Sequence, residues 1–252
     1  MSGPASAVAF LTVFPGRKHI DRSALIWFPI VGVVLGVLLG GIWYGANLLW
    51  PPGVAAALVV GADIAGTGTL HMDGLVDSAD GLLPPMSRQR RLSVMSDPHA
   101  GAFGLVAVVA VLMVRFGALM DIHPSLLVIC GLWASSRGYA ASVVNLVPYA
   151  RDGGIANLFN TDDSSPVRPV GHSHWRAKGS SVFPAVIGLA IAITVMSMWS
   201  PLYGLTAIAV SLGVFVLVIA FGYIKLGGFT GDVIGAAIVL AETAGLVMAA
   251  AR

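Results

Sequence analysis

The sequence predicts an all-α protein, a polytopic membrane bundle of about seven transmembrane helices. Hydrophobic residues make up 57% of the 252 residues and charged residues only 10%, with a mean hydropathy of +0.87. Soluble domains carry about 25% charged residues, so this composition lies outside their range. Uncharged stretches run from residue 23 to 62 and from 179 to 224. Each is longer than the roughly 20 residues that a helix needs to cross a bilayer.

Short proline-containing breaks at residues 50–53, 121–124 and 200–201 divide the apolar stretches into individual spans. The expected spans are about 24–49, 52–70, 101–120, 124–148, 181–199, 202–224 and 231–251. No internal repeat is evident, so we expect residues 1–252 to form a single membrane-embedded domain. The apolar segment at residues 5–13 is too short to span and lacks a cleavage pattern, which favours an interfacial helix over a signal peptide.

The positively charged residues gather on one side of the expected bundle. Of the 14 Lys and Arg residues, all but Arg115, Arg137 and Arg252 fall in the N-terminal segment or in three connections on the same side. The positive-inside bias places that side in the cytoplasm, with the N-terminus inside and the C-terminus outside. A net charge of +2 without a basic stripe argues against nucleic-acid binding. The single cysteine, Cys130, excludes an internal disulfide and a cysteine-based metal site.

Three aspartates in the segment 71–81, HMDGLVDSADG, are spaced for one face of a helix. At ~100° per residue, Asp73, Asp77 and Asp80 fall within roughly 60° of one another. Such crowding raises the pKa of each carboxyl group unless a cation neutralises the charge, and carboxylate oxygens are ligands that Mg²⁺ prefers. The pattern therefore predicts a metal site, with a solvated helix face as the alternative. The chain has only 12 acidic residues, which weakens that alternative.

The segment before the third expected span contains Asp97, Pro98 and His99. A carboxylate followed by proline is typical of a helix start, so Asp97 is a candidate N-cap. In a second interpretation, Asp97 and His99 face the aspartates of segment 71–81 and add a carboxylate and an imidazole to the site. The two interpretations are compatible.

The last expected span opens with Gly227, Gly228, Thr230 and Asp232. Paired glycines let a backbone approach a ligand closely, and the N–H groups of a helix start favour a phosphate. Asp232 would repel that phosphate unless a metal bridges the two, so we interpret it as a metal ligand or a general base. Alternatively, Thr230 or Asp232 is simply the N-cap of the helix.

Charged residues inside the expected spans need partners, because an unpaired charge within a bilayer is costly. Arg115 lies near Asp121, and we assign it a structural role. Arg137 could instead reach an anionic group of a substrate. Asp63, Asp121 and Glu242 are the available counter-charges, but the sequence does not pair them.

The connection 149–180 begins with Tyr149, Ala150 and Arg151. Arg151 is the candidate phosphate ligand there, because a planar guanidinium matches phosphoryl oxygens. His172 and His174 would face opposite ways on an extended chain and are weak candidates as metal ligands.

The segment 71–81 resembles the H-x-D-G-x-x-D-x-x-D-G signature of the cobalamin synthase family, the adenosylcobinamide-GDP ribazoletransferases. Further segments that agree in order and spacing are 10–12, 14–15, 27–32, 136–138, 149–151 and 227–237, with Glu242 beyond them. The resemblance covers nearly the whole chain. Two departures are present: Asp97-Pro98-His99 stands where members usually have Asp-Ser-Arg, and Thr69-Leu70 stands where paired glycines are common.

The resemblance implies a Mg²⁺-dependent transfer that joins adenosylcobinamide-GDP to α-ribazole, or to its 5′-phosphate, and releases GMP. Asp73, Asp77 and Asp80 would hold one or two Mg²⁺ ions. Asp232 or Asp97 would deprotonate the ribose hydroxyl, with Asp232 preferred. The residues expected to contact the substrates are Arg151, Arg137, His99 and Thr230.

The same resemblance implies a multi-pass protein of the bacterial inner membrane whose active site faces the cytoplasm. Its expected partners are the two small-molecule substrates and the lipid bilayer, with no nucleic acid. A homo-oligomer is compatible with the sequence, and nothing in the sequence requires one.

Two other functions are considered from the residues. A secondary transporter would place Asp63, Arg137 and Glu242 along an ion path. The densest polar segment, however, lies at the membrane surface rather than at the midplane. A CDP-alcohol phosphotransferase would use a comparable acidic helix, but the D-G-x-x-A-R motif of that family is absent.

Overall fold

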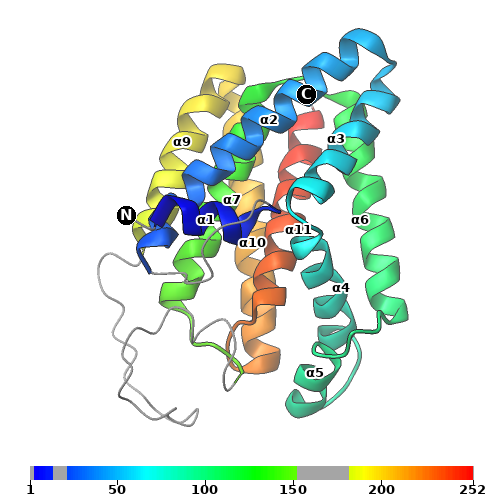
Figure 1. The fold of residues 1–252 in the computed structure, drawn as a ribbon, viewed down its shortest axis with the longest axis vertical. Helices are drawn as coiled ribbons and strands as arrows, with labels where there is room; N and C mark the ends of the chain where they lie inside the picture. Colours follow the sequence, from blue (N-terminus) through cyan, green and yellow to red (C-terminus); the bar gives the residue numbers. More distant parts are fainter. Residues whose placement is uncertain (1–2, 14–21, 152–181, 252) are drawn as a thin grey trace.

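The structure is a computed structural model that describes residues 3–13, 22–151 and 182–251. Within these residues the chain forms helices and a single isolated β-bridge, without a strand. Figure 1 shows the helices α1 (Gly3–Leu11), η1 (Arg22–Trp27), α2 (Phe28–Leu49), α3 (Pro52–Gly66), α4 (Leu70–Leu82), α5 (Arg88–Val94), α6 (Ala102–Asp121), α7 (Leu126–Leu146), α9 (Phe183–Trp199), α10 (Pro201–Leu226) and α11 (Gly231–Ala250). The expected all-α class is confirmed.

Five helical segments are long and apolar enough to cross a membrane: η1 with α2, α6, α7, α10 and α11. The chain is therefore a multi-pass membrane protein, and five of the seven expected spans are full-length apolar helices. The second expected span, 52–70, ends at Gly66 after only 15 residues, and α3 and α4 then meet at an angle of 87°. Counted together, they would give a sixth span. Helix α9, with 17 residues, is also shorter than a full span.

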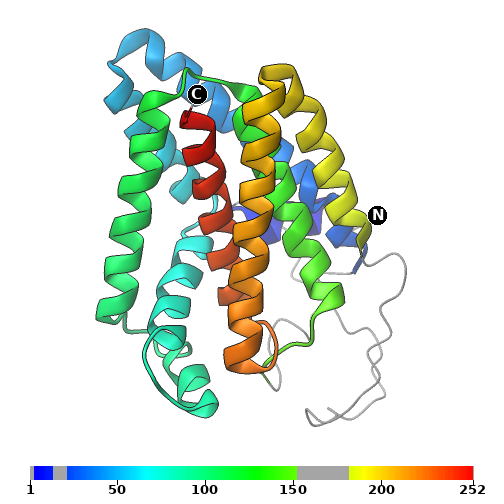
Figure 2. The same cartoon turned by 180° about the vertical axis from the view of Figure 1, so that it is seen from behind.

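Helix α7 forms the centre of the bundle and packs against α2 and α9. In Figures 1 and 2, α6 and α9 form opposite edges, and α11 lies between α6 and α10. Glycines at four-residue spacing on α2 permit its close packing against α7. A Cβ atom on Gly32 would lie 2.4 Å from the carbonyl oxygen of Trp133, and one on Gly36 would lie 2.6 Å from the Cα of Cys130.

The turn between α3 and α4 uses two consecutive left-handed residues, Gly68 and Thr69, each with φ of 62°. This conformation is favourable for glycine and costly for threonine. The turn redirects the chain so that α4 runs along α11 and α6. Helix α4 is not among the five spanning segments, and it carries the three aspartates of segment 71–81.

The sequence offered Thr230 and Asp97 as candidate N-caps, and only Thr230 caps a helix in the structure. Thr230 is the N-cap of α11, and its Oγ1 accepts a hydrogen bond from the backbone N–H of Val233 at 3.2 Å. Asp97 is not the N-cap of α6, because that helix begins at Ala102 with Gly101 as its N-cap residue. The Asp80 carboxylate from α4 takes the capping role instead, as described below.

Candidate active site

The first turn of α11 lies directly against α4, and Gly74 makes this approach possible. A Cβ atom on Gly74 would lie 2.7 Å from the carbonyl oxygen of Asp232, so a side chain there would force the helices apart. Gly74, which makes the contact with α11, therefore follows directly after Asp73 in the sequence. As a result, residues more than 150 positions apart in the chain share one site.

A second long-range contact brings Arg151 to the same place. The segment ending at Ala150 pairs with the residues before α11: the N–H of Ala150 donates to the carbonyl of Phe229 at 2.8 Å, and the N–H of Phe229 donates to that of Pro148 at 2.9 Å. A Cβ atom on Gly228 would lie 2.4 Å from the Pro148 oxygen. The close approach that we expected the paired glycines to allow is therefore used by the chain itself at Gly228.

Arg151 and Asp232 form an ion pair at the end of this paired segment. Nη2 of Arg151 lies 2.9 Å from Oδ2 of Asp232 and also donates to the carbonyl of Met95 at 3.0 Å. Both side chains are partly exposed, whereas Nε of Arg151 is buried without a partner in the described residues. The guanidinium is thus held in place with donor capacity to spare for an anion.

Asp77 lies at the centre of the site. The pKa of Asp77 is raised to about 7, first by burial and then by the nearby charges of Asp232 and Asp73, whereas the charge of Arg151 lowers it. Asp80 adds a weaker repulsion. The structure therefore brings together Asp73, Asp77, Asp232 and Arg151, which we call the acidic cluster. Such a cluster of like charges favours a bound cation.

Asp80 lies one turn beyond Asp77 and binds the start of α6. Its Oδ2 accepts from the N–H of Gly101 at 2.7 Å, and its Oδ1 accepts from the N–H of Gly104 at 2.9 Å. These bonds satisfy N–H groups that have no partner within the helix, and the charge suits the helix dipole. Each oxygen keeps a further lone pair. The expected metal role of Asp80 therefore stays a prediction beside its observed capping role.

Asp97 and His99 form a pair on an exposed turn. Oδ1 of Asp97 lies 2.7 Å from Nδ1 of His99 and accepts from its backbone N–H at 3.0 Å. These hydrogen bonds lower the pKa of Asp97. The side chains are 55% and 89% exposed. The pair is satisfied locally, so the geometry favours Asp232 over Asp97 as the general base, and the substrate role of His99 stays a prediction.

Two arginines to which the sequence analysis assigned no role support the acidic cluster from α5. Arg88 donates to the carbonyls of Leu226 and Ala150 at 2.6 and 2.8 Å, which ties the end of α10 to the segment before Arg151. Arg91 is buried and donates to two carbonyls at the end of α4. A basic helix that directly follows an acidic one could have drawn attention to these arginines. The backbone carbonyl groups to which they donate cannot be predicted from a sequence.

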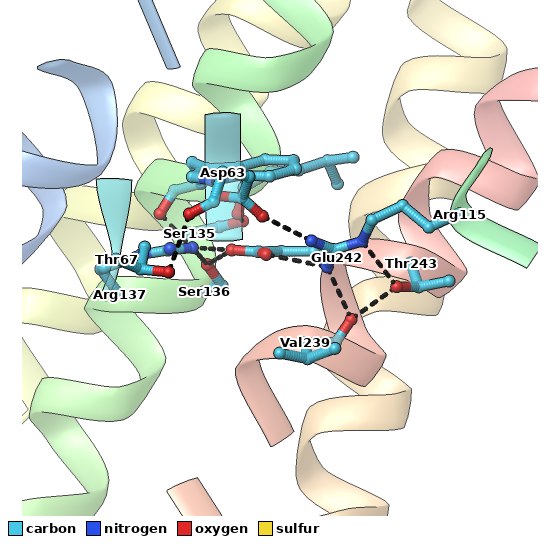
Figure 3. A network of polar contacts seen from close by, with 11 residues as sticks. Asp63, Thr67, Arg115, Ser135, Ser136, Arg137, Val239, Glu242 and Thr243 are labelled. Atoms are coloured by element: carbon cyan, nitrogen blue, oxygen red, sulfur yellow. Dashed lines mark hydrogen bonds and ion pairs between the residues drawn. The ribbon is translucent and has the colours of Figure 1, made fainter. Parts of the chain in front are cut away.

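The charged residues within the spans form one buried network (Figure 3). Arg115 lies 2.6 Å from Asp63 and 3.1 Å from Glu242, rather than beside Asp121, which is exposed. Glu242 also pairs with Arg137. Trp133 donates a hydrogen bond to Asp63 and Ser136 donates one to Glu242, whereas Oγ1 of Thr243 accepts one from Arg115.

This network joins α3, α6, α7 and α11 and is buried, although Nε and Nη2 of Arg137 have no hydrogen-bond partner in the described residues. Asp63 is 7% exposed, Glu242 1% and Arg137 0%, and each has an opposite charge as a partner. Paired charges that are shielded from solvent do not resemble the ion path of a transporter. Arg137 is fully buried here, so the geometry favours a structural role for it over the expected contact with a substrate.

His71, the first residue of the acidic motif, faces inward from α4. It is 6% exposed, and its Nε2 has no hydrogen-bond partner in the described residues. Burial holds the pKa of His71 well below its usual range, so the imidazole is neutral. An unpaired buried polar atom is unusual and calls for an explanation.

The residues present fit Mg²⁺ better than a metal that needs a complete protein cage. Within the described residues, no three His, Cys, Asp or Glu side chains form a group that could hold a metal ion. Mg²⁺ is commonly bound by one or two carboxylates, with water and substrate phosphates supplying the other ligands. Asp73 and Asp77, on successive turns of α4, supply two such carboxylates.

Comparison with known proteins places this arrangement in a family. The model of the family described as cobalamin-5-phosphate synthase matches residues 3–250. The curated relatives include an adenosylcobinamide-GDP ribazoletransferase from Pseudomonas paraeruginosa, 34% identical over 94% of this chain and 90% of the relative. Proteins of the same name from Vibrio parahaemolyticus and Chlorobium phaeovibrioides are 33% and 31% identical, each over 94% of this chain, and are covered over 87% and 92% of their own lengths. No solved structure matches the chain.

Proposed function

The chain belongs to the cobalamin-5-phosphate synthase family, and we propose that it is an adenosylcobinamide-GDP ribazoletransferase whose reaction takes place at the acidic cluster. It joins adenosylcobinamide-GDP to α-ribazole in cobalamin biosynthesis. The observation that carries the placement is the convergence of Asp73, Asp77, Asp232 and Arg151 at the contact of α4 with α11.

The reaction needs few groups, and the cluster offers them. A ribose hydroxyl of the acceptor attacks the phosphorus that bears the cobinamide. A new P–O bond forms, and the phosphoanhydride bond to GMP breaks. Catalysis of this type rests on positioning and on stabilising charge, because the developing charge is spread over phosphoryl oxygens.

Asp232 is the group placed to accept the hydroxyl proton. Its carboxylate is partly buried at the start of α11 and is held by Arg151 at 2.9 Å. The N–H groups of the first turn of α11 and the spare donors of Arg151 favour a phosphate beside it. Arg151 therefore both orients the base and binds the phosphoryl group that the base serves.

Asp73 and Asp77 are the residues that would hold Mg²⁺, with Asp80 as a further candidate. When bound, Mg²⁺ neutralises charge on the pyrophosphate and on the departing GMP. The chain's own contribution is to present the two carboxylates on one face of α4, next to Asp232. The pKa of Asp77, which burial raises first and the charges of Asp232 and Asp73 raise next, supports this assignment.

We further propose that the acidic cluster faces the cytoplasm from the inner membrane of a bacterium. The relatives are bacterial proteins. Helices α4 and α5 lie at the end of the bundle opposite the C-terminus (Figure 1), and the arginines of α5 agree with the positive-inside bias for that end.

The test is GMP release by the purified protein in detergent, supplied with adenosylcobinamide-GDP, α-ribazole and Mg²⁺. We expect Asp77→Asn to lower kcat by at least about 100-fold, because metal and charge stabilisation at such sites contribute on that order. Asp121→Asn, which removes an exposed carboxylate at the far end of α6, is the matched control and should retain wild-type turnover. Wild-type protein that is folded but releases no GMP would overturn the assignment.

A further inference from the structure

A small cavity lies beside the acidic cluster, among α1, α2, α4, α7 and α11. Its volume is about 80 Å³, and it is largely enclosed and apolar. Its walls include aromatic side chains from three parts of the chain, Phe10, Phe28 and Phe229, together with Ala140 of α7. The cavity is much too small for a corrinoid, so the larger substrate cannot occupy it.

The aromatic wall is ordered by packing. The rings of Phe10 and Phe28 stack with centroids 5.7 Å apart and an interplanar angle of 25°. Phe229, which precedes α11 in the chain and also lines the cavity, is 4% exposed. Flat apolar walls of this kind suit a planar aromatic ring, because aromatic pairs gain stability beyond simple burial.

One polar atom within this lining has no partner. His71 lines the cavity, and its buried Nε2 makes no hydrogen bond in the described residues. An imidazole N–H left unpaired in an apolar site costs free energy that a ligand acceptor would recover. The cavity therefore favours a ring with one acceptor atom over a plain hydrocarbon such as a lipid chain.

The other end of the cavity meets the catalytic groups. Asp73 and Asp232 belong to its lining, beside Gly231 and Gly235 at the start of α11. A ligand whose ring enters the cavity would leave any attached sugar at these carboxylates. The geometry thus joins an aromatic pocket to the proposed general base.

We propose that this cavity binds the aromatic base of the acceptor nucleoside, with Nε2–H of His71 donating a hydrogen bond to the free ring nitrogen of the base. The inference rests on the proposed function and adds the place and the recognition of the acceptor. The benzimidazole of α-ribazole has one such nitrogen, opposite its glycosidic nitrogen. A bicyclic ring is larger than the cavity, so Phe10 and Leu11 of α1, which line it, shift outward as the ring enters and then pack against the ring.

The experiment compares two acceptors, α-ribazole and the matched α-riboside of indole, in which a C–H group replaces the free ring nitrogen. KM for each acceptor and KM for adenosylcobinamide-GDP are measured from GMP release. With wild-type protein we expect KM for the indole riboside to be on the order of tenfold higher, the effect of leaving a buried donor unpaired. Equal KM values for the two acceptors would overturn the proposal.

The variant His71→Leu tests whether His71 causes the difference in KM between the two acceptors. It should raise KM for α-ribazole to the level of the indole riboside and leave KM for adenosylcobinamide-GDP unchanged. If the variant still discriminates between the acceptors, or if only KM for adenosylcobinamide-GDP changes, the hydrogen bond from His71 is wrong. The wild-type comparison stands alone if His71→Leu does not fold.

A second variant tests the pocket apart from the hydrogen bond. Phe10→Leu removes the stacked wall and should raise KM for both acceptors while preserving their ratio. Phe103→Leu, at an exposed position on α6, is its control and should leave both values unchanged. Equal effects of the two variants would contradict an aromatic pocket. Absence of GMP release by wild-type protein with its natural substrates would instead contradict the proposed function.

Discussion

Asp77 is half-buried and close enough to Asp73, Asp232 and Arg151 for their charges to act on it. Without a bound cation, ionisation of Asp77 adds a negative charge to a site that already carries others, and burial adds to the cost. The residue therefore favours either a proton or a metal ion. This competition has a consequence for stability that can be measured without any substrate.

The stability of the metal-free protein should fall as Asp77 ionises. Its folded-state pKa of about 7 lies above its ordinary value of 3.8, so ionisation destabilises the fold as pH rises from about 4 through 7. In EDTA, Asp77→Asn should match wild-type Tm near pH 4 and exceed it increasingly up to about pH 8. Thermal unfolding in detergent measures this difference. If the Tm values of the two proteins change with pH in parallel, ionisation of Asp77 does not destabilise the fold.

Other carboxylates show how position decides the role of a residue. The sequence assigned the cap of α6 to Asp97, the acid that precedes it in the chain, whereas Asp80 of α4 makes the contact. Local spacing predicts which aspartates share a helix face. It does not predict which helix start lies opposite one of them, because that depends on the packing of α4 against α6.

At the level of elements, the turn between α3 and α4 positions the acidic cluster. Thr69 has a left-handed backbone there, and its Oγ1 donates to the carbonyl of Gly68 at 2.6 Å. A branched residue in this conformation costs about 1–2 kcal/mol, which the turn must offset elsewhere.

We expect Thr69→Gly to stabilise the protein. Glycine removes the left-handed cost but has more conformational freedom in the unfolded chain, so the net gain should be about 0.5–1 kcal/mol. Unfolding in detergent by heat or denaturant measures the change. Leu70→Gly, at the first residue of α4, is a useful contrast and should destabilise the helix. A loss of stability in Thr69→Gly would mean that its hydroxyl contributes more than the strain costs.

The contact of α4 with α11 was only partly predictable. The 0, 4, 7 spacing of Asp73, Asp77 and Asp80 predicted one face of a helix, and α4 is helical throughout that segment. The sequence also singled out Asp232 and Arg151. It could not predict that the pairing of Ala150 with Phe229 would bring them together, because such a bridge joins distant segments without a periodic signal.

At the level of the whole molecule, the buried ion pairs hold four helices in register. Arg115 and Arg137 both contact Glu242, and Asp63 supplies a second acid. The composition predicted a helical membrane bundle, and the buried charges predicted that partners must exist. The identity of the partners required the fold, since each ion pair of the network joins residues that are far apart in the sequence.

Removal of the shared acid should weaken the entire bundle. Glu242→Gln leaves two buried guanidinium groups with one acid between them, and breaking a buried pair in this way costs on the order of 3–5 kcal/mol. We expect a clearly lower Tm in detergent, with Asp121→Asn as a control that stays near wild type. An unchanged Tm for Glu242→Gln would show that the network contributes little to stability.

The central claim is that the acidic cluster binds a divalent cation together with the nucleotide substrate. Titration with Mn²⁺, followed by electron paramagnetic resonance, tests it directly because Mn²⁺ is accepted by the same oxygen ligands as Mg²⁺. In the presence of adenosylcobinamide-GDP, wild-type protein and Asp121→Asn should show saturable binding that the double variant Asp73→Asn/Asp77→Asn has lost. Equal Mn²⁺ binding by all three proteins would contradict the account.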